Sequence, residues 1–387
     1  MSFKSTIEFI KSIYPNKDFI PLHEPKFIGN EKNYVLETIE STFVSSVGEF
    51  VNKFEQEIAS TTGAKYAVAI VNGTSALHLA LKCAGVKNDE LVITQSLSFI
   101  ATTNAISYLG AEPIFIDVDL QTMGLCPIAL KNWLINETEL KINKETGKKE
   151  CIHIESQKKI SVVVPMHTFG HPCKIDQIQT ICEEYQIALI EDAAESIGSQ
   201  YNNKHTGTFG LAGVFSFNGN KTITCGGGGA IITNDEAFAK MAKHLSTQAK
   251  LPHKWEFNHD MVGYNYRMPN LNAALACAQL EQLNVFIENK RQLAKIYNEF
   301  FAKIDGIEYK LEPENSKSNY WLHTIQLRDL DQRNLFLTET NENGIMTRPT
   351  WTPTHLLPMY KNAICGDLEN TIFLADRLIN ISSSVRL

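Results

Sequence analysis

Residues 66–84 read Tyr66-Ala-Val-Ala-Ile-Val71, then Asn72-Gly-Thr-Ser75, then Ala76-Leu-His-Leu-Ala-Leu-Lys-Cys-Ala84. The first run is continuously apolar, as in a strand that is buried on both faces of a parallel sheet. The last run has the length and composition of a helix that covers such a strand. This unit of strand, turn and helix predicts an α/β fold.

The same alternation continues to about residue 236. Further strands are predicted at 91–94, 113–116, 161–165, 188–192, 214–217 and 230–233, and helices at 30–42, 49–62, 99–109, 175–185 and 236–245. Strands that alternate with helices imply a mostly parallel, doubly wound sheet. We therefore expect a large α/β domain at 1–245, which includes the N-terminal segment.

The rest of the chain lacks this alternation and is expected to form a smaller C-terminal α+β domain at 246–387. Pro269 is predicted to start one long helix that runs to about Phe301, because proline is tolerated in a first turn. Within the large domain, a charged insert at 136–159 contains a Glu-Thr-Gly-Lys turn, which predicts an exposed hairpin. This hairpin is either a solvated excursion or an arm that contacts a partner.

The composition is that of an ordinary globular protein, with 387 residues, 43% of them hydrophobic and 20% charged. The formal net charge of -7 offers no basic surface for nucleic acid or for an anionic membrane. No apolar run reaches the roughly 18–20 residues that span a bilayer. The eight cysteines are scattered, without zinc-ligand spacing, so we expect free thiols in a reducing cytoplasm and no metal site.

Lys221 stands between the apolar run Val214-Phe-Ser-Phe217 and four glycines, Gly226-Gly-Gly-Gly229. It has no carboxylate nearby in the sequence, and its apolar neighbours would desolvate the ammonium. Desolvation lowers the pKa of a lysine and frees its amine to attack a carbonyl. Such a lysine forms a Schiff base with a substrate or with pyridoxal phosphate. Taken alone, the pattern also fits a surface lysine beside a glycine loop.

The turn Asn72-Gly-Thr-Ser75 lies between a strand end and a helix start. In a parallel α/β sheet the carboxyl ends of the strands face one crevice, in which ligands bind. Backbone N–H groups, two hydroxyls and the helix dipole would hold a phosphate at this turn. The alternative is that Thr74 or Ser75 only caps the helix.

Two more side chains are expected at this crevice. Asp192 ends the apolar strand 188–192, where a buried carboxylate needs a cation or an N–H donor. A protonated pyridine nitrogen is such a partner, and this pairing makes pyridoxal phosphate an electron sink. The alternative is that Asp192 caps the next helix. Phe99 follows a third strand and offers a flat face to a planar ring, unless it belongs to the core.

The order and spacing of these features resemble the DegT/DnrJ/EryC1/StrS family of nucleotide-sugar aminotransferases, which are fold-type I pyridoxal-phosphate enzymes. The resemblance extends from Pro21 to Leu387. Its motifs here are Asn72-Gly-Thr-Ser-Ala-Leu77, Ser98-Phe-Ile-Ala-Thr102, Pro165-Met-His-Thr-Phe-Gly170, Glu191-Asp-Ala-Ala-Glu-Ser-Ile-Gly198, Ser216-Phe-Asn-Gly-Asn-Lys221 and Gly263-Tyr-Asn-Tyr-Arg-Met268.

The resemblance implies a role for each candidate residue. Lys221 is implied to bind the cofactor covalently and to move protons, Asp192 to partner the pyridinium nitrogen, and Phe99 to stack on the ring. Glu195 stands where the family often has Gln near the ring hydroxyl. Family members with His in place of the lysine are dehydratases, so Lys221 implies transamination.

The resemblance also implies a phosphate site and a homodimer. Asn265 would reach the phosphate from the neighbouring subunit, so that each active site is shared. The phosphate-binding positions of the family are matched by Gly73, Thr74, Ser75 and Ser216.

The implied reaction moves an amino group from L-glutamate to C4 of a 4-keto-6-deoxy nucleotide sugar in cell-surface glycan or nonulosonic acid biosynthesis. The sugar is expected to be UDP- or GDP-linked, with or without a 2-acetamido group. Glu195 and the Asn218-Gly-Asn-Lys221 context resemble the perosamine, bacillosamine and legionaminic acid branch, and the insert at 136–159 is most similar to the legionaminic acid enzymes. One departure is Gly226-Gly-Gly-Gly229, where the family commonly has Gly-Glu-Gly-Gly.

Two other functions are alternatives to transamination. A nucleotide-dependent oxidoreductase would share the doubly wound sheet, but the sequence has neither a Gly-x-Gly-x-x-Gly unit nor a Walker sequence. A non-enzymatic, pyridoxal-phosphate-binding regulator would carry an added DNA-binding module, for which there is no spare domain and no basic patch.

Five other side chains were considered for the site. His78 and His167 are expected to be packed or hydrogen-bonded residues rather than catalysts. Trp351, His355 and Tyr360 lie in a loop interrupted by proline, where they either line a sugar-nucleotide cleft or anchor the loop.

Overall fold

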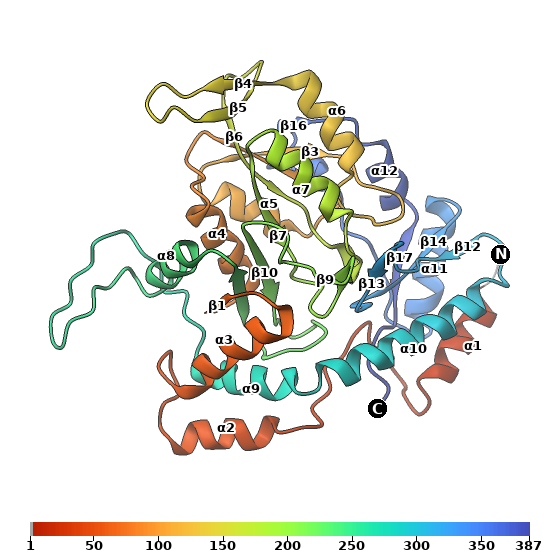
Figure 1. The fold of residues 1–387 in the computed structure, drawn as a ribbon. Coiled ribbons are helices and arrows are strands. Elements are labelled where there is room, and N and C mark those ends of the chain that lie inside the picture. Colours follow the sequence, from red (N-terminus) through yellow and green to blue (C-terminus); the bar gives the residue numbers. More distant parts are fainter. Residues whose placement is uncertain (1–2) are drawn as a thin grey trace.

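The computed structural model describes residues 3–387, and its centre is a large twisted sheet (Figure 1). Five neighbouring strand pairs, from β10 to β16, are parallel, whereas β11 is antiparallel to both of its neighbours. The prediction of a mostly parallel sheet is confirmed. In spatial order the strands are β1 (Tyr66–Ile70), β11 (Gly229–Thr233), β10 (Ala212–Ser216), β7 (Ala188–Asp192), β6 (Lys159–Val164), β2 (Leu91–Gln95), β3 (Glu112–Ile116) and β16 (Ile364–Cys365).

Helices cover both faces of this sheet. Successive residues of a strand point to opposite sides, so apolar side chains of one strand pack on both faces. Val214 and Ile231 pack with the helices of one face, and Phe215 and Ile232 with those of the other. The first face carries α4 (Gly73–Cys83), α5 (Ile100–Ser107) and α8 (Glu236–Ser246). The second carries α3 (Glu49–Thr62), α6 (Pro127–Glu137), α7 (Ile175–Glu184) and α9 (Asn270–Leu280), with α2 (Glu31–Glu40) packed on α9.

A second, four-stranded antiparallel sheet lies in the C-terminal part of the chain. Its strands are β12 (Ile307–Tyr309), β14 (His323–Leu327), β17 (Leu378–Ile381) and β15 (Arg348–Pro349). It packs with α1 (Lys4–Ile13), α10 (Leu283–Phe301) and α11 (Leu330–Glu342). α12 (Glu369–Ala375) packs in a further core cluster, which lies between the large sheet and the smaller one. The first helix of the chain thus packs with the smaller sheet, and the domain division at residue 245 stays a prediction.

The helix predicted from Pro269 to Phe301 is wrong, because the chain forms two helices there, α9 and α10. At the junction the N–H of Gln282 donates to the carbonyl of Gln279, three residues back, which tightens the turn and ends α9. α9 packs against α3, and α10 begins in the same core with Leu283, Phe286 and Ile287 before it reaches the core of the smaller sheet. The segment therefore connects the two cores.

The insert at 136–159 forms the predicted hairpin, with strands β4 (Thr138–Ile142) and β5 (Lys149–His153). β5 also pairs, through Cys151 and Ile152, with the amino end of the interior strand β6, so the hairpin projects from the large sheet beyond that end (Figure 1). Three short strands, β8 (Gln200–Tyr201), β9 (Lys204–His205) and β13 (Ser316–Lys317), form a third sheet that connects the two halves of the chain.

All eight cysteines are free thiols in the structure. In the described part of the chain, residues 3–387, no helix combines the length and the apolar character needed to cross a bilayer.

Candidate active site

A cavity of about 320 Å³ opens beside the carboxyl ends of β7 and β10 and the amino ends of α4 and α5. Ser75 and Asn265 are not among the residues that line it. The predicted site residues that do line it are Gly73, Thr74, Phe99, Asp192, Glu195, Ser216 and Lys221. Residues more than a hundred positions apart in the sequence therefore meet in one cavity, as expected for the crevice of a parallel sheet.

One corner of the cavity is formed by the amino end of α4. Asn72 caps this helix, because its Oδ1 accepts a hydrogen bond from the N–H of Ser75 at 2.8 Å. The alternative that Thr74 or Ser75 is the cap is therefore wrong, and both lie in the first turn. The N–H groups of a first turn lack intrahelical acceptors and, with the helix dipole, favour an anion.

Ser216, the last residue of β10, lies against this corner. A Cβ atom at residue 73 would stand 2.8 Å from the Cβ of Ser216, so glycine is needed for the close approach. Gly73 thereby brings a hydroxyl next to the free N–H groups of the helix. A phosphate group fits the chemistry of this corner.

Asp192 is the last residue of β7 and is 2% exposed. Its Oδ2 accepts a hydrogen bond from the hydroxyl of Thr102 at 2.6 Å, and its Oδ1 accepts one from the N–H of Ala194 at 3.1 Å. No helix follows Asp192 directly, so the alternative that it caps a helix is wrong. Burial raises the pKa of the carboxyl, while these two hydrogen bonds and the charge of Lys221 lower it. A protonated ring nitrogen in the cavity would provide the cation that this buried carboxylate needs.

Thr102 was not predicted as a site residue, although it belongs to the motif Ser98-Phe-Ile-Ala-Thr102 and donates to Asp192. It lies three positions after Phe99 at the start of α5, and residues three apart share one face of a helix. Phe99 borders the cavity and is 48% exposed, so the alternative that it belongs to the core is wrong. The signal that could have identified Thr102 is its place in the first turn of the helix that follows β2, at the crevice of the sheet.

The loop aromatic Trp351 also lines the cavity, with its ring centroid 6.2 Å from that of Phe99. The other two candidates of this loop serve as anchors. His355 places Nδ1 2.6 Å from the Oγ of Ser96, and the hydroxyl of Tyr360 donates to Asn104 at 2.9 Å. Trp351 therefore fits the interpretation that the loop lines a cleft, whereas His355 and Tyr360 fit the interpretation that they anchor the loop.

Lys221 enters the cavity between an acid and an aromatic ring. Its Nζ lies 3.4 Å from the Oε1 of Glu195 and 4.0 Å from the centroid of the Trp321 ring. The Nε1 of Trp321 donates to the carbonyl of Asn220 at 2.6 Å, which ties the indole to the residue before the lysine. Trp321 was not predicted, because no local pattern shows that a residue a hundred positions away comes to lie against Lys221.

Glu195 is almost completely buried, at 3% exposure, and its Oε2 accepts a hydrogen bond from the N–H of Phe169 at 2.8 Å. Burial raises the pKa of this carboxyl to about 7, although the charge of Lys221 lowers it. Glu195 can therefore hold or release a proton near neutral pH, within reach of the amine of Lys221.

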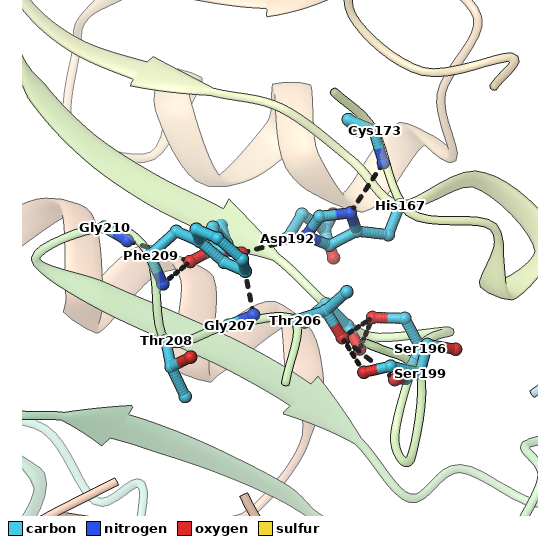
Figure 2. A network of polar contacts seen from close by, with 12 residues as sticks. His167, Cys173, Asp192, Ser196, Ser199, Thr206, Gly207, Thr208, Phe209 and Gly210 are labelled. Atoms are coloured by element: carbon cyan, nitrogen blue, oxygen red, sulfur yellow. Dashed lines mark hydrogen bonds and ion pairs between the residues drawn. The ribbon is translucent and has the colours of Figure 1, made fainter. Parts of the chain in front are cut away.

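His167 belongs to a buried polar network next to Asp192, whose backbone carbonyl accepts from the N–H of His167 at 3.1 Å (Figure 2). The Nδ1 of His167 accepts a hydrogen bond from the N–H of Cys173 at 3.1 Å, which leaves the proton on Nε2, 3.0 Å from a carboxylate oxygen of Glu191. Glu191 also accepts from the N–H groups of Gly207, Phe209 and Gly210. His167 is hydrogen-bonded, as predicted, and it does not line the cavity.

His78 and Asn265 lie outside the cavity. His78 is buried, with its Nδ1 3.0 Å from the hydroxyl of Tyr266, so its predicted packing role is confirmed. Asn265 is exposed, and its Oδ1 accepts a long hydrogen bond of 3.5 Å from Arg267. Its predicted contribution to a neighbouring subunit's site stays a prediction.

Within residues 3–387, no group of three or more His, Cys, Asp or Glu side chains is arranged to hold a metal ion. Asp117 accepts hydrogen bonds from the N–H groups of Asn370 and Thr371 at the start of α12. Asp119 pairs with the Nζ of Lys174 at 2.6 Å. Both carboxylates are therefore engaged in structural contacts.

Comparison with known proteins identifies the family to which the chain belongs. Residues 25–387 match the DegT/DnrJ/EryC1/StrS aminotransferase family. The chain is 37% identical to the GDP-perosamine synthase of Escherichia coli O157:H7, over 90% of this chain and 91% of that protein. It is 35% identical to the GDP-perosamine synthase of Vibrio cholerae, over 89% of this chain and 88% of that protein.

A solved structure agrees on the fold. The aminotransferase TlmJ from Streptoalloteichus hindustanus superimposes with a TM-score of 0.84 at 24% identity, over 94% of this chain and 93% of that one. The family match shows a pyridoxal-phosphate-dependent sugar aminotransferase, so it does not support the oxidoreductase and regulator alternatives. The chain therefore belongs to the DegT/DnrJ/EryC1/StrS family of pyridoxal-phosphate-dependent sugar aminotransferases.

Proposed function

We propose that this enzyme transfers the amino group of L-glutamate to C4 of a GDP-linked 4-keto-6-deoxy sugar, and that the cavity around Lys221 is its active site. One observation supports the site above all: the amine of Lys221, the buried carboxylate of Asp192 and the amino end of α4 converge on the same cavity. The names of the two GDP-perosamine synthases support the substrate, since they favour a GDP-linked sugar over the UDP-linked alternative.

In this proposal the amino end of α4 and the hydroxyl of Ser216 would hold the phosphate of the cofactor, and Phe99 would offer its flat face to the ring. Pyridoxal phosphate, when bound, supplies a carbonyl that exchanges amino groups and a ring that accepts electrons. Trp351, beside Phe99, lies where it can exclude water from the reacting centre.

Asp192 keeps a proton on the ring nitrogen. Its two hydrogen bonds, from Thr102 and Ala194, fix the carboxylate in one orientation, and its burial strengthens any charge interaction across the cavity. This assignment makes Asp192 the group that sustains the electron-accepting property of the ring.

Lys221 is the residue that would hold the cofactor through Nζ, and its amine, when free, would move a proton at the reacting centre. Glu195 lies 3.4 Å from Nζ, and its Oε1 accepts a hydrogen bond from the amine, so it can orient the amine. The ring of Trp321 attracts the ammonium form and holds Nζ over the cavity.

We further propose that the active enzyme is a homodimer in which Asn265 reaches the phosphate of the partner's cofactor. The observation behind this proposal is the exposed position of Asn265, outside the cavity of its own chain. The test is the molecular mass in solution, measured by light scattering, together with the variant Asn265→Ala. A monomer with full activity would contradict the proposal.

The reaction is tested with purified enzyme, pyridoxal phosphate, L-glutamate and a GDP-linked 4-keto-6-deoxy hexose. Mass spectrometry should detect the amino sugar nucleotide, formed in equal amount with 2-oxoglutarate. The variant Lys221→Ala should form none, whereas Lys303→Ala, which removes a surface lysine, should retain full activity. Turnover of a UDP-linked keto sugar alone, or of another amino donor in preference to glutamate, would refute the corresponding part of the substrate assignment.

A further inference from the structure

Lys290 of α10 is buried completely, with 0% of its surface exposed. Its Nζ donates to three backbone carbonyls: Ser383 at 2.5 Å, Trp321 at 3.1 Å and Tyr320 at 3.4 Å. In the described part of the chain, no carboxylate forms an ion pair with this ammonium. A lysine in such surroundings is rare, because burying a charge without a counter-charge is costly.

The geometry shows what this lysine holds in place. Three carbonyls match the three N–H groups of an ammonium, so the contacts favour the charged form, whereas burial lowers the pKa to about 7. Two of these carbonyls belong to one turn, at Tyr320 and Trp321, and the third follows β17. Tyr320 has a φ of 48°, in the left-handed region, so the turn is strained and depends on its surroundings.

This turn carries the indole that lies against the proposed reacting amine. The Nε1 of Trp321 donates to the carbonyl of Asn220 at 2.6 Å, and its ring centroid is 4.0 Å from the Nζ of Lys221. A continuous set of contacts therefore leads from the Nζ of Lys290, through the backbone and ring of Trp321, to Lys221.

We propose that Lys290 is a positioning residue for Lys221. It fixes the turn at Tyr320 and Trp321, and the indole in turn fixes the backbone at Asn220 and the amine of Lys221. The inference rests on the proposed function, in which Lys221 is the reacting amine.

The test uses Lys290→Met, which removes all three donors, and Lys290→Arg, which retains charged donors at altered positions. Lys310→Met is the matched control, since Lys310 is also buried in the smaller lobe but contacts Glu308, outside the cavity. The first measurement is the rate at which Lys221 is acylated in the apoenzyme, followed by peptide mass spectrometry. The second is the separation of kcat from KM in the loaded enzyme.

In Lys290→Met, Lys221 should lose its contact with the ring of Trp321, and the rate at which Lys221 is acylated should rise about threefold. Displacement of the amine should lower kcat about tenfold. The KM for the sugar nucleotide should stay within about twofold, because its binding contacts remain. Lys290→Arg should be intermediate, and Lys310→Met should match the wild type.

Trp321→Phe provides an independent second variant, because it keeps a ring but removes the donor to Asn220. Its effect on kcat and that of Lys290→Met should not multiply in the double variant, since both break the same set of contacts. If circular dichroism shows that Lys290→Met is unfolded, Lys290→Arg combined with Trp321→Phe provides the same comparison.

Wild-type acylation of Lys221 in the folded Lys290 variants, or fully multiplicative effects on kcat, would overturn the proposal. Borohydride reduction of the loaded wild type separates this failure from a wrong function. A pyridoxyl group on Lys221 with unaltered acylation would reject only the role of Lys290, whereas a pyridoxyl group elsewhere would reject the proposed function itself.

Discussion

Glu191 and Asp192 are neighbours on β7, are equally inaccessible, and differ in how their charges are satisfied. Glu191 accepts from three backbone N–H groups and faces the Nε2 of His167, so all its lone pairs have partners on the protein (Figure 2). Asp192 accepts from one hydroxyl and one backbone N–H and faces a cavity.

The comparison teaches how to recognise a functional carboxylate. A buried acid with a complete set of donors has reached its lowest energy within the fold, and it stabilises the loops that supply the donors. A buried acid with open acceptor positions towards a cavity keeps its pKa raised until a ligand completes its contacts. Glu191 is thus structural, and Asp192 is the candidate for chemistry.

The largest effect is expected for Asp192→Asn. The amide cannot keep the ring nitrogen protonated, so kcat should fall about 10³-fold, while the cofactor should still be tagged on Lys221. Initial rates of amino-sugar formation measure the loss. A decrease of less than about tenfold would show that Asp192 is not the ring partner.

Glu191→Gln tests the structural role of Glu191, and it is preferred to Glu191→Asn because it keeps the length of the side chain. Its amide NH₂ would face backbone N–H donors, and the free energy of unfolding should fall by about 3 kcal/mol. Urea denaturation of the apoenzyme measures this change, and Asp192→Asn is the matched control, with an expected change below about 1 kcal/mol. Equal destabilisation by both variants would remove the distinction between the two acids.

Thr102→Val sharpens the comparison by removing the hydroxyl that orients Asp192. We expect kcat to fall about tenfold, the value of one hydrogen bond to a charged group. Thr103→Val is the matched control, because the hydroxyl of Thr103 is buried without a hydrogen-bond partner. Steady-state kinetics should place the control within about twofold of the wild type, and equal losses would contradict the role of Thr102.

The smallest change in turnover is expected for Glu195→Gln, about threefold or less, because an amide can still contact the ring hydroxyl. Its effect on the pH dependence of stability is distinctive. The pKa of Glu195 is raised from 4.5 to about 7 by burial, so the folded apoenzyme binds more protons than the unfolded chain between these values. The free energy of unfolding should therefore decline as pH rises through this window.

Urea denaturation of the wild type and of Glu195→Gln at about pH 5 and about pH 7.5 measures this decline. The variant should lose the part of the pH dependence that Glu195 contributes. Identical pH profiles would show that Glu195 is ionised throughout the window.

Most strands of the large sheet, most of the helices between them, and the places of Lys221 and Asp192 at the cavity could be predicted because their signals are local, whereas α1, α6 and β16 were not predicted. Apolar runs of about five residues predict buried strands, and polar residues at strand ends predict the crevice. The insert 136–159 was predictable as a hairpin because of its turn residues, but its pairing with β6 was not.

The rest depends on contacts between distant parts of the chain. Nothing near Lys221 in the sequence reveals that Glu195 and Trp321 lie beside it, since only the closed fold brings them there. The break between α9 and α10 was missed for a similar reason, because apolar residues continue through the junction and α10 passes from the core it shares with α9 into the core of the smaller sheet. Helical periodicity alone does not report such a change of packing partner.

The most direct test of the central claim is the site of cofactor attachment. Purified protein is loaded with pyridoxal phosphate, its visible absorption is recorded before and after borohydride reduction, and the reduced protein is digested for peptide mass spectrometry. We predict a visible absorption band that borohydride abolishes and a single pyridoxyl group on Lys221. The absence of such a band, or a pyridoxyl group on another lysine, would contradict the assignment of this cavity as the active site.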